Sequence, residues 1–370
     1  MADDVLEPTR TVLHVACNLG SGVAAVIASY AGLTPEYRHV LLADLDPSCP
    51  IEHLTSAMAE VLPLGSGAVE RAWRIRSEVR RLAPDVIHAH SSYAGAFVRL
   101  AIADRDRIVH TPHCYGFTRR DLGWPARSVV WLAEAALSHR GRHVAACSPH
   151  EYRSARRLPG RRTVTYVPNA VPDRAPVPVV GHSSPLVVSV GRLCPQKSPE
   201  LFAAAAELSR RRGLDLRWRW VGGGSPEYVD RLTRVGVEVT GWVPRERAWA
   251  HIAGAQVYVH TAAWESAPLT ILEAAAAGVP VLARDHPALR LLGLRPLWTG
   301  VDEVVDILAG FPSAQVFAVA VAAGRELAAA HQPANQRAAL LRVYAAVAAR
   351  EGTPADLTPL GAGTRARRST

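Results

Sequence analysis

The chain has almost no lysine. Of its 42 basic residues, Lys197 is the single lysine and all the others are arginines. Lysine is normally among the commonest residues, so this composition indicates a coding sequence that uses arginine wherever a positive charge is enough. An ammonium is a compact charge that can turn to meet several phosphate oxygens, whereas a guanidinium is a flat five-donor fork. We therefore expect a role for Lys197 that arginine fills badly; a solvated lysine retained by chance is the alternative.

Long apolar runs and paired cysteines are also missing. No stretch approaches 18 uninterrupted apolar residues, and the first ten residues are acidic and polar where a signal peptide would be basic and then apolar. The five cysteines are scattered, with no CxxC pair, which predicts reduced thiols and no zinc site. The net charge of +9 is spread evenly, so no nucleic-acid partner is expected. These features predict a bacterial protein of the cytoplasm.

Short β-branched runs alternate with helical stretches in two successive series. The first begins with TVLHVACNL and the second with LVVSVGR, and a linker rich in proline and serine separates them. This alternation is typical of buried parallel sheets. We predict an α/β fold of two doubly wound, Rossmann-like domains that face a central cleft: an N-terminal domain over 1–175, a C-terminal domain over 176–332, a final helix over 333–351 and a disordered tail over 352–370.

The lone lysine lies in GRLCPQKS, directly after a strand-like run. Gly191 would end the strand, and Arg192 and Lys197 would then project from the carboxyl edge of the sheet into the cleft. Two cations five residues apart on such a turn can hold a diphosphate from two sides, each charge-assisted bond contributing roughly 1.5–3 kcal/mol. An ordinary basic loop accounts for Arg192 but leaves the lysine unexplained.

A second motif, WESAPLTILEAAAAGVP, combines two glutamates with a helix start. Glu265 is expected at the end of a strand-like run and Glu273 about one turn into the following helix. The amides of Leu269 and Thr270 would be unpaired donors of the first helical turn, which attract anions. Two glutamates at this spacing are common by chance, so their position opposite Arg192 and Lys197 carries the prediction.

Glycines also follow the first strand, in LGSGVAA. Gly20, Ser21 and Gly22 fit a variant of the dinucleotide-binding turn, and Asp44 lies about where a ribose-binding acid belongs. This pattern supports a rival hypothesis, a nicotinamide-dependent dehydrogenase. Asp44 and Asp46 could also form a metal-binding carboxylate pair, although two aspartates one residue apart are common.

Polar residues end several strands of the first domain. His90, His113 and Ser148 are expected to face the cleft, whereas His88 fits a hydrogen-bonded structural histidine better. No spacing among them selects a metal site or a Ser-His-Asp triad.

Several ordered segments resemble those of one family. The chain is similar to the retaining, GT-B-fold glycosyltransferases that use nucleotide-diphosphate sugars ("glycosyl transferases group 1"), which include bacterial polysaccharide and phosphatidylinositol mannosyltransferases. The resemblance runs from about Val12 to Ala283 and rests on DVIHAHSSYAGAFVRLA, VHTPH, ACS, VPNAV, GRLCPQKS and ESAPLTILEAAAAGVPVLA, in that order. The last segment matches the Glu-x7-Glu signature of the family.

The resemblance implies roles for the second-domain residues. Arg192 and Lys197 would hold the donor diphosphate and stabilise the charge that develops on it. Glu273 would bind the ribose hydroxyls of the nucleotide, and Glu265 would bind hydroxyls of the transferred sugar. The chain departs from the family at RDHPALRLLG, where a Gly-rich turn and another glutamate are usual, which leaves the sugar and the base open.

For the first domain, the resemblance implies that His113 lies at the transferred sugar and that residues 20–22 form a glycine loop at the phosphates and the acceptor. The same loop then explains the dinucleotide-like pattern. The family usually has Asn-Gly where this chain has Asn169-Ala170.

The implied activity is a retaining, metal-independent transfer of a sugar from a UDP- or GDP-sugar to a hydroxyl of a lipid-linked or polysaccharide precursor. The nucleotide sugar is a co-substrate, and no other cofactor is expected. Glycosylation of a small natural product by the same chemistry is an alternative. An NAD-dependent oxidoreductase and a non-catalytic sugar-nucleotide-binding subunit are alternatives from other classes.

One segment suggests contact with lipid. Residues 117–131 mix arginines with Trp124 and Trp131, a composition that suits the inner face of the plasma membrane or a lipid-linked acceptor. A packed helix with a solvated basic edge explains it equally well.

Overall fold

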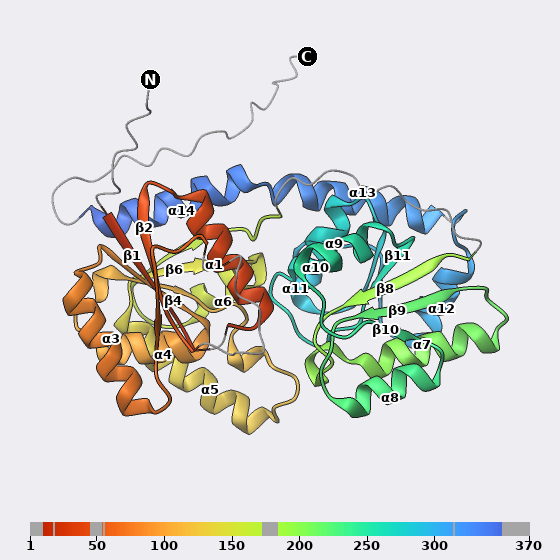
Figure 1. Ribbon diagram of the computed structural model, residues 1–370, viewed down its shortest axis with the longest axis horizontal. Coiled ribbons are helices and arrows are strands. Elements are labelled where there is room, and N and C mark those ends of the chain that lie inside the picture. The colour runs from red at the N-terminus through yellow and green to blue at the C-terminus, as the bar shows by residue number, and fades with distance from the viewer. Residues whose placement is uncertain are drawn as a thin grey trace, which may run out of the picture.

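A computed structural model of the chain describes residues 10–17, 19–44, 54, 56–171, 184–313 and 315–349. Two parallel sheets, each covered by helices, form two lobes that lie side by side (Figure 1). The strands of the first sheet come from residues 10–166 and those of the second from residues 186–298. This is the predicted α/β fold of two Rossmann-like domains.

The first sheet has seven parallel strands in the order β3-β2-β1-β4-β5-β6-β7. Its central strands are buried on both faces, because β-branched and aliphatic side chains alternate toward both layers of helices. The strands are β1 (Arg10–Ala16), β2 (Tyr37–Ala43), β3 (Glu60–Pro63), β4 (Val86–His90), β5 (Ile108–Thr111), β6 (His143–Ala146) and β7 (Thr163–Tyr166). The helices are α1 (Ser21–Leu33), α3 (Ala68–Leu82), α4 (Ser91–Ala101), α5 (Trp124–Leu137) and α6 (Pro149–Arg157).

The second sheet has six parallel strands in the order β10-β9-β8-β11-β12-β13. The strands are β8 (Leu186–Val190), β9 (Arg217–Val221), β10 (Glu238–Val239), β11 (Val257–His260), β12 (Val281–Arg284) and β13 (Leu297–Trp298). The helices are α7 (Pro199–Arg211), α8 (Pro226–Arg234), α9 (Arg245–Ala253), α10 (Leu269–Ala276), α11 (Pro287–Leu291), α12 (Val301–Ala309) and α13 (Gln315–Ala330).

The last helix, α14 (Pro333–Ala348), returns to the first lobe. Leu340, Val343 and Tyr344 are buried there against Val12 and Val86 of the first sheet. Burying an apolar side chain of this size contributes about 1.5–3 kcal/mol to stability. The final helix therefore fastens the end of the described chain to its first lobe, while α13 packs on the second (Figure 1).

Two chain segments cross between the lobes, and they bind each other. His331 Nδ1 lies 2.6 Å from the Asn169 carbonyl oxygen, and Gln336 Nε2 donates to the Pro168 carbonyl oxygen at 2.7 Å. Both bonds are buried. The lobes are thus joined by two paired crossings, a geometry suited to a hinge.

The two series of strands alternating with helices are confirmed, but the strand-like runs of the sequence do not include β3 and β13. β3 and β13 have four and two residues and lie at sheet edges, where a short run carries little periodic signal. The expected domain boundary at 175 and the expected tail over 352–370 lie outside the described residues. Within the described part of the chain, no helix has both the length and the apolar character to cross a bilayer.

Candidate functional site

Close backbone contacts that only glycine permits shape the turn after β8. A Cβ on Gly222 would lie 2.3 Å from the Gly191 carbonyl oxygen, and one on Gly224 would lie 2.4 Å from the Leu193 carbonyl oxygen. Gly222 and Gly224 also have φ values of 131° and 156°, which side chains disfavour. The loop 222–224 therefore fixes the turn 191–198. Sequence reasoning missed this loop, although three consecutive glycines after a strand were a signal.

The structure brings Lys197 and Glu265 into direct contact. Their side chains form an ion pair and are 20% and 11% exposed. Glu265 lies in the loop after β11, five residues beyond the strand end, so the expectation that it ends the strand is wrong: β11 stops at His260 because the chain turns there toward the 195–198 segment. Thr261 Oγ1 donates to the Lys197 carbonyl oxygen at 2.6 Å and holds the two loops together.

Arg192 and the start of α10 supply further groups for an anion at the same edge. Arg192 directly follows Gly191, and its side chain is exposed. Helix α10 begins at Leu269 with Pro268 at its N-cap, so the amides of Leu269 and Thr270 have no acceptor within the helix. An arginine, a lysine and a helix start thus lie on the two loops that follow β8 and β11, two neighbouring strands.

Glu273 is buried on α10 and pairs with Arg245, whose Nη2 lies 3.1 Å from Glu273 Oε1. Arg245 begins α9 and was not predicted, because its pattern is that of any helix-starting arginine. Tyr258 of β11 donates to Thr270 Oγ1 at 2.8 Å. Burial raises the pKa of Tyr258, and the nearby carboxylates of Glu273 and Glu265 raise that pKa further. The carboxylates of Glu273 and Glu265 are therefore both close enough to the buried Tyr258 to affect its pKa.

The glycine turn of the first lobe lies at the start of α1. The Gly20 carbonyl oxygen accepts hydrogen bonds from the amides of Val23 and Ala24, at 2.9 and 3.2 Å. α1 begins at Ser21, and no described residue lies within 4 Å of a Cβ built on Gly22. This turn lies at the carboxyl edge of β1, as predicted.

Asp44, the candidate ribose-binding acid of the dehydrogenase hypothesis, is paired with Arg71, whose Nη2 lies 2.7 Å from Asp44 Oδ2. Asp46, the other half of the candidate metal pair, lies outside the described residues. The ion pair gives Asp44 a role inside the first lobe that needs no ligand.

His113 lies in a constrained turn beyond β5. His113 and Cys114 have φ values of 53° and 104°, an uncommon conformation for residues with a side chain. The buried carboxylate of Glu151 holds this turn: its Oε1 accepts from the Cys114 amide at 2.8 Å and its Oε2 from the Cys147 amide at 2.7 Å. Burial raises the pKa of Glu151, while the two backbone hydrogen bonds oppose that rise.

Sequence reasoning missed Glu151, although a signal was present. Ser148 and Glu151 have the spacing of a capping box, and Ser148 Oγ accepts from the Glu151 amide at 3.0 Å. The Ser148 hydroxyl also lies 2.9 Å from the Ser266 hydroxyl, next to Glu265. Ser148 therefore contacts the second lobe, but its side chain is fully buried there, which corrects the expectation that it faces an open cleft.

The other histidines differ in their surroundings. His88 is buried, with Nδ1 3.0 Å from the Tyr344 hydroxyl and Nε2 2.8 Å from the Thr111 hydroxyl, so it is the structural histidine that we expected. His90 is also fully buried, and its Nδ1 lies 3.0 Å from His113 Nε2. His90 therefore lies behind His113 and has no exposed surface of its own, which corrects the prediction that it faces the cleft.

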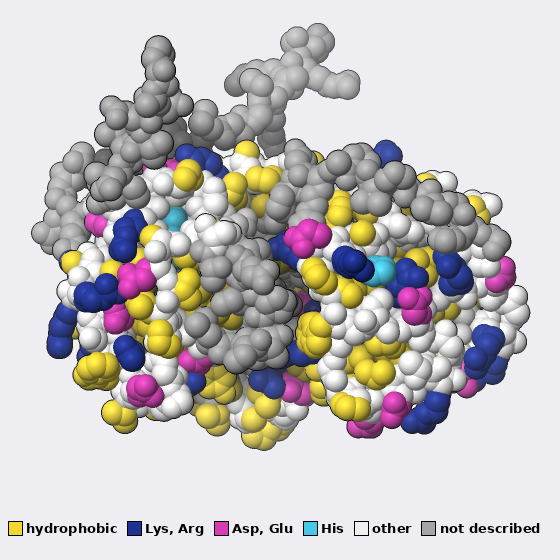
Figure 2. Space-filling model, viewed as in Figure 1, with side chains coloured by type: hydrophobic (Ala, Val, Ile, Leu, Met, Phe, Trp, Pro, Cys, Tyr) yellow, Lys and Arg dark blue, Asp and Glu magenta, His cyan; other side chains and the backbone are white. Residues whose placement is uncertain are grey.

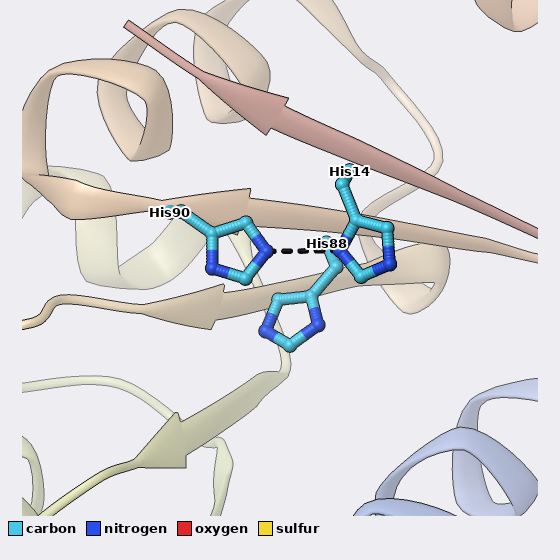
Figure 3. A group of neighbouring side chains, drawn as sticks. All are labelled: His14, His88 and His90. Atoms are coloured by element: carbon cyan, nitrogen blue, oxygen red, sulfur yellow. Dashed lines mark hydrogen bonds between the residues drawn. The ribbon is translucent and has the colours of Figure 1, made fainter. Parts of the chain in front are cut away.

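His14, His88 and His90 lie together inside the first lobe (Figure 3), with nitrogens within 4.8 Å of one another. A metal ion could bridge such a group. Their nitrogens, however, are engaged in hydrogen bonds, as between His14 Nδ1 and His90 Nε2 at 3.0 Å, the dashed line in Figure 3. A metal would have to displace these bonds.

Both halves of the chain match known family models. Residues 22–174 match the family described as "Glycosyltransferase Family 4", and residues 184–295 match "Glycosyl transferases group 1". The first range covers most of the first lobe and the second covers the strands and loops that carry Lys197, Glu265 and Glu273.

Two curated relatives match more than half of the chain. An uncharacterized 41.2 kDa protein in the cps region of Klebsiella pneumoniae is 24% identical over 250 residues, covering 60% of this chain and 68% of that protein. The UDP-Gal:alpha-D-GlcNAc-diphosphoundecaprenol alpha-1,3-galactosyltransferase of Escherichia coli is 26% identical over 225 residues, covering 54% of this chain and 58% of that enzyme. The match thus spans less than two thirds of the galactosyltransferase.

Solved structures share the fold over nearly the whole chain. Anabaena HepE in complex with UDP-glucose superposes with a TM-score of 0.72 at 16% identity, covering 90% of this chain and 99% of that one. A glycosyltransferase from Rickettsia africae superposes with a TM-score of 0.69 at 12% identity, covering 92% and 99%. At these identities the likeness shows the fold: two Rossmann-like domains in the GT-B arrangement.

Proposed function

Because this chain belongs to the GT-B glycosyltransferases of group 1, we propose that it transfers a sugar from a UDP-sugar to a hydroxyl acceptor with retention of configuration. The observation that carries this proposal is the contact between Lys197 and Glu265 at the carboxyl edge of the second sheet. UDP is our choice of nucleotide because the galactosyltransferase relative is named for a UDP-sugar and the Anabaena structure contains UDP-glucose.

The donor diphosphate would bind between the turn 191–198 and the start of α10. Lys197 and Arg192 would contribute the positive charges, and the amides of Leu269 and Thr270 would donate hydrogen bonds to phosphate oxygens. These groups stabilise the negative charge that develops as the diphosphate leaves, so we propose that the reaction needs no metal ion.

The two glutamates would bind the ribose and the transferred sugar of the donor. Glu273 would accept hydrogen bonds from the ribose hydroxyls while its buried carboxylate stays paired with Arg245. Glu265 would accept hydrogen bonds from the transferred sugar, next to Lys197. His113, across the cleft, would contact that sugar from the first lobe, and residues 20–22 would lie at the phosphates and the acceptor.

The reaction itself would break the bond between the anomeric carbon and the phosphate oxygen. The anomeric centre would gain oxocarbenium-ion character, and the acceptor hydroxyl would attack from the face that the diphosphate leaves. The leaving phosphate oxygen would take the acceptor proton. Closure about the paired crossings near Asn169 would exclude water that could hydrolyse the donor.

A lipid-linked acceptor would suit the outer face of α5. Trp124, Val129 and Leu132 are 77%, 65% and 61% exposed, a composition unusual for a water-facing helix. Trp124, Trp131 and Leu132 also line an open groove of about 500 Å³ together with Arg127. Figure 2 shows hydrophobic side chains along the lower edge of the molecule, where Figure 1 draws α5. We propose that this face contacts the membrane or the lipid carrier from the cytoplasmic side.

The decisive experiment for the activity measures nucleotide release from UDP-glucose, UDP-galactose, UDP-N-acetylglucosamine and GDP-mannose, with and without candidate acceptors. A transferase releases nucleotide from one donor faster than the uncatalysed rate, and Glu265→Gln abolishes that release. Glu326→Gln is the matched control, because Glu326 is exposed on the same lobe and, among the residues that the structure describes, pairs with Arg295 at the surface. Donor binding without release of nucleotide under any condition would favour a non-catalytic subunit.

The membrane contact has a separate test. Flotation with vesicles that contain anionic lipid should carry the wild-type protein to the top of the gradient, and Trp124→Ala together with Leu132→Ala should abolish flotation. Wild-type protein that stays at the bottom with both neutral and anionic vesicles would refute the contact while leaving the proposed reaction intact.

A further inference from the structure

Four imidazoles of the first lobe form a continuous hydrogen-bonded chain. His39 Nδ1 lies 3.0 Å from His14 Nε2, His14 Nδ1 lies 3.0 Å from His90 Nε2, and His90 Nδ1 lies 3.0 Å from His113 Nε2. Successive rings are nearly parallel, with interplanar angles of 25°, 28° and 23°. The proposed reaction uses only the last of these rings, so the other three need an explanation.

Strand register explains why the row of four histidines leads to the carboxyl edge of the first sheet. The histidines come from β2, β1, β4 and the turn after β5, which are neighbours in the sheet. His39 pairs with Val12, two residues before His14, and His90 pairs with Ala16, two residues after His14. Since alternate residues share a face of a sheet, each step stays on one face and advances toward the carboxyl edge. The last ring lies beyond that edge.

The far end of the chain fixes the direction of every hydrogen bond. His39 Nε2 lies 2.9 Å from the Thr34 carbonyl oxygen and 3.1 Å from the Thr34 hydroxyl, whose proton is donated to the Tyr30 carbonyl oxygen. Both Thr34 oxygens can therefore only accept, so His39 Nε2 carries a proton. A neutral His39 then accepts at Nδ1 from His14 Nε2. In the same way, His14 Nδ1 accepts from His90 Nε2, and His90 Nδ1 accepts from His113 Nε2.

We propose that this one-way chain holds His113 as the tautomer protonated at Nε2, so that His113 Nδ1 is a fixed hydrogen-bond acceptor for a hydroxyl of the bound sugar. His39, His14 and His90 are positioning residues that act through His113. The proposal rests on the proposed function for the identity of the hydroxyl, but the tautomer follows from the hydrogen bonds alone.

The chemistry of the two His113 nitrogens agrees with this assignment. Nε2 is used by His90, whereas Nδ1 makes no hydrogen bond to any described residue, and the His113 side chain is partly exposed. A sugar hydroxyl is the natural donor for such a nitrogen. A pocket that presents an acceptor discriminates against a sugar in which that hydroxyl is missing or replaced by fluorine, which cannot donate.

The lowered pKa values of these histidines indicate that each of the four rings is neutral at neutral pH and carries one proton. Burial lowers the pKa of His14, His39 and His90, and it lowers the pKa of His113 to about 4. Each ring then has one donor and one acceptor nitrogen. His88, which stacks on His90 with centroids 4.3 Å apart, lies outside the chain because both its nitrogens meet hydroxyl groups.

Nitrogen NMR of protein labelled with 15N-histidine tests the proposal without any substrate. Long-range 1H–15N correlations report which ring nitrogen carries the proton. We expect His113 to be protonated at Nε2 in the wild type and in His39→Asn, whose side-chain oxygen can replace Nδ1 as the acceptor for His14. In His39→Leu that acceptor is lost, and His113 should shift toward protonation at Nδ1.

A mixture of tautomers at His113 in the wild type would overturn the proposal, as would an unchanged tautomer in His39→Leu. A metal held by His14, His88 and His90, revealed by spectra that change when a chelator is added, would also overturn it. Should His39→Leu fail to fold, the wild type and His39→Asn still decide.

Kinetics link the tautomer to the reaction. Nucleotide release from UDP-glucose or UDP-galactose should fall roughly tenfold in His39→Leu, the value of one hydrogen bond, and return in His39→Asn. If the wild-type protein has no activity but His113 is protonated at Nε2, the proposed function is refuted. The proposed role of the four hydrogen-bonded histidines in fixing the His113 tautomer would still hold.

Discussion

Lys197 and Glu265 are 68 residues apart in the chain and share an ion pair at the carboxyl edge of the second sheet. Lys197 also packs along the backbone of Gly191, where a Cβ would lie 3.1 Å from Lys197 Cε. The Lys197 side chain is thus held between a glycine and a carboxylate, where the larger, planar guanidinium of an arginine would need more room. This relationship gives a physical reason for the single lysine of an arginine-rich chain.

Replacing Lys197 should remove most of the activity. If Lys197 binds the diphosphate as proposed, Lys197→Ala would lose at least one charge-assisted bond to phosphate, so turnover should fall roughly 10- to 150-fold. Lys197→Arg keeps the charge and should still lose most of the rate, because the fork is bulkier than the ammonium. Nucleotide-release assays measure both, and an arginine variant as active as the wild type would contradict this account.

Glu273→Gln should weaken donor binding more than it slows the chemical step. The substitution removes the charge that would bind the ribose and leaves Arg245 without its carboxylate partner. We expect the KM for the UDP-sugar to rise about tenfold with a smaller change in kcat. An unchanged KM, with the variant as stable as the wild type, would remove Glu273 from the donor site.

The loop 222–224 after β9 should not tolerate a side chain on Gly224. Gly224→Ala places a Cβ against the Leu193 backbone and should destabilise the protein by about 1–3 kcal/mol. Gly32→Ala, on α1, is the control, since nothing lies within 4 Å of its Cβ; it should be neutral or slightly stabilising. Urea unfolding compares them, and equal midpoints would show that the loop is not closely packed.

Stability should fall as the pH drops below neutrality. Burial lowers the pKa of many histidines below their unfolded value near 6.5, so below that pH the unfolded chain binds more protons than the folded one. The strongest shifts are those of His14, His88, His90, His110, His113, His260 and His286. Each imidazole that stays neutral in the fold should cost about 1 kcal/mol between pH 7.5 and 5.5. Urea unfolding at the two values measures this, and equal stability would be the contrary result.

Chelation should leave the reaction unaffected. Because Lys197, Arg192 and the start of α10 are proposed to stabilise the leaving diphosphate, EDTA should change the initial rate of nucleotide release by less than about twofold. A strict requirement for added Mn²⁺ would transfer that role to a metal ion and weaken the case for Lys197.

Sequence patterns predicted the architecture because each central strand is a continuous apolar run followed by a helix. They also placed Lys197 with Glu265, since both follow strands of one parallel sheet. Edge strands β3 and β13 escaped prediction because two to four residues carry little periodicity.

Several missed site features depend on contacts between segments that are distant in the sequence. Arg245 is recognisable only through its ion pair with Glu273, 28 residues later. The capping-box spacing of Ser148 and Glu151 was a local signal, but the contacts of the Glu151 carboxylate with the amides of Cys114 and Cys147 are visible only in the fold. The histidine chain needs the register of four strands, which no local pattern contains.

The single lysine makes the central claim directly measurable. Protein labelled with 15N-lysine has one side-chain ammonium, that of Lys197, and therefore one signal to follow during titration with UDP. The account predicts that UDP shifts this signal in a saturable way and that Glu265→Gln changes its starting position. A signal that stays unchanged while UDP binding is demonstrated by calorimetry would contradict the claim that Lys197 holds the diphosphate.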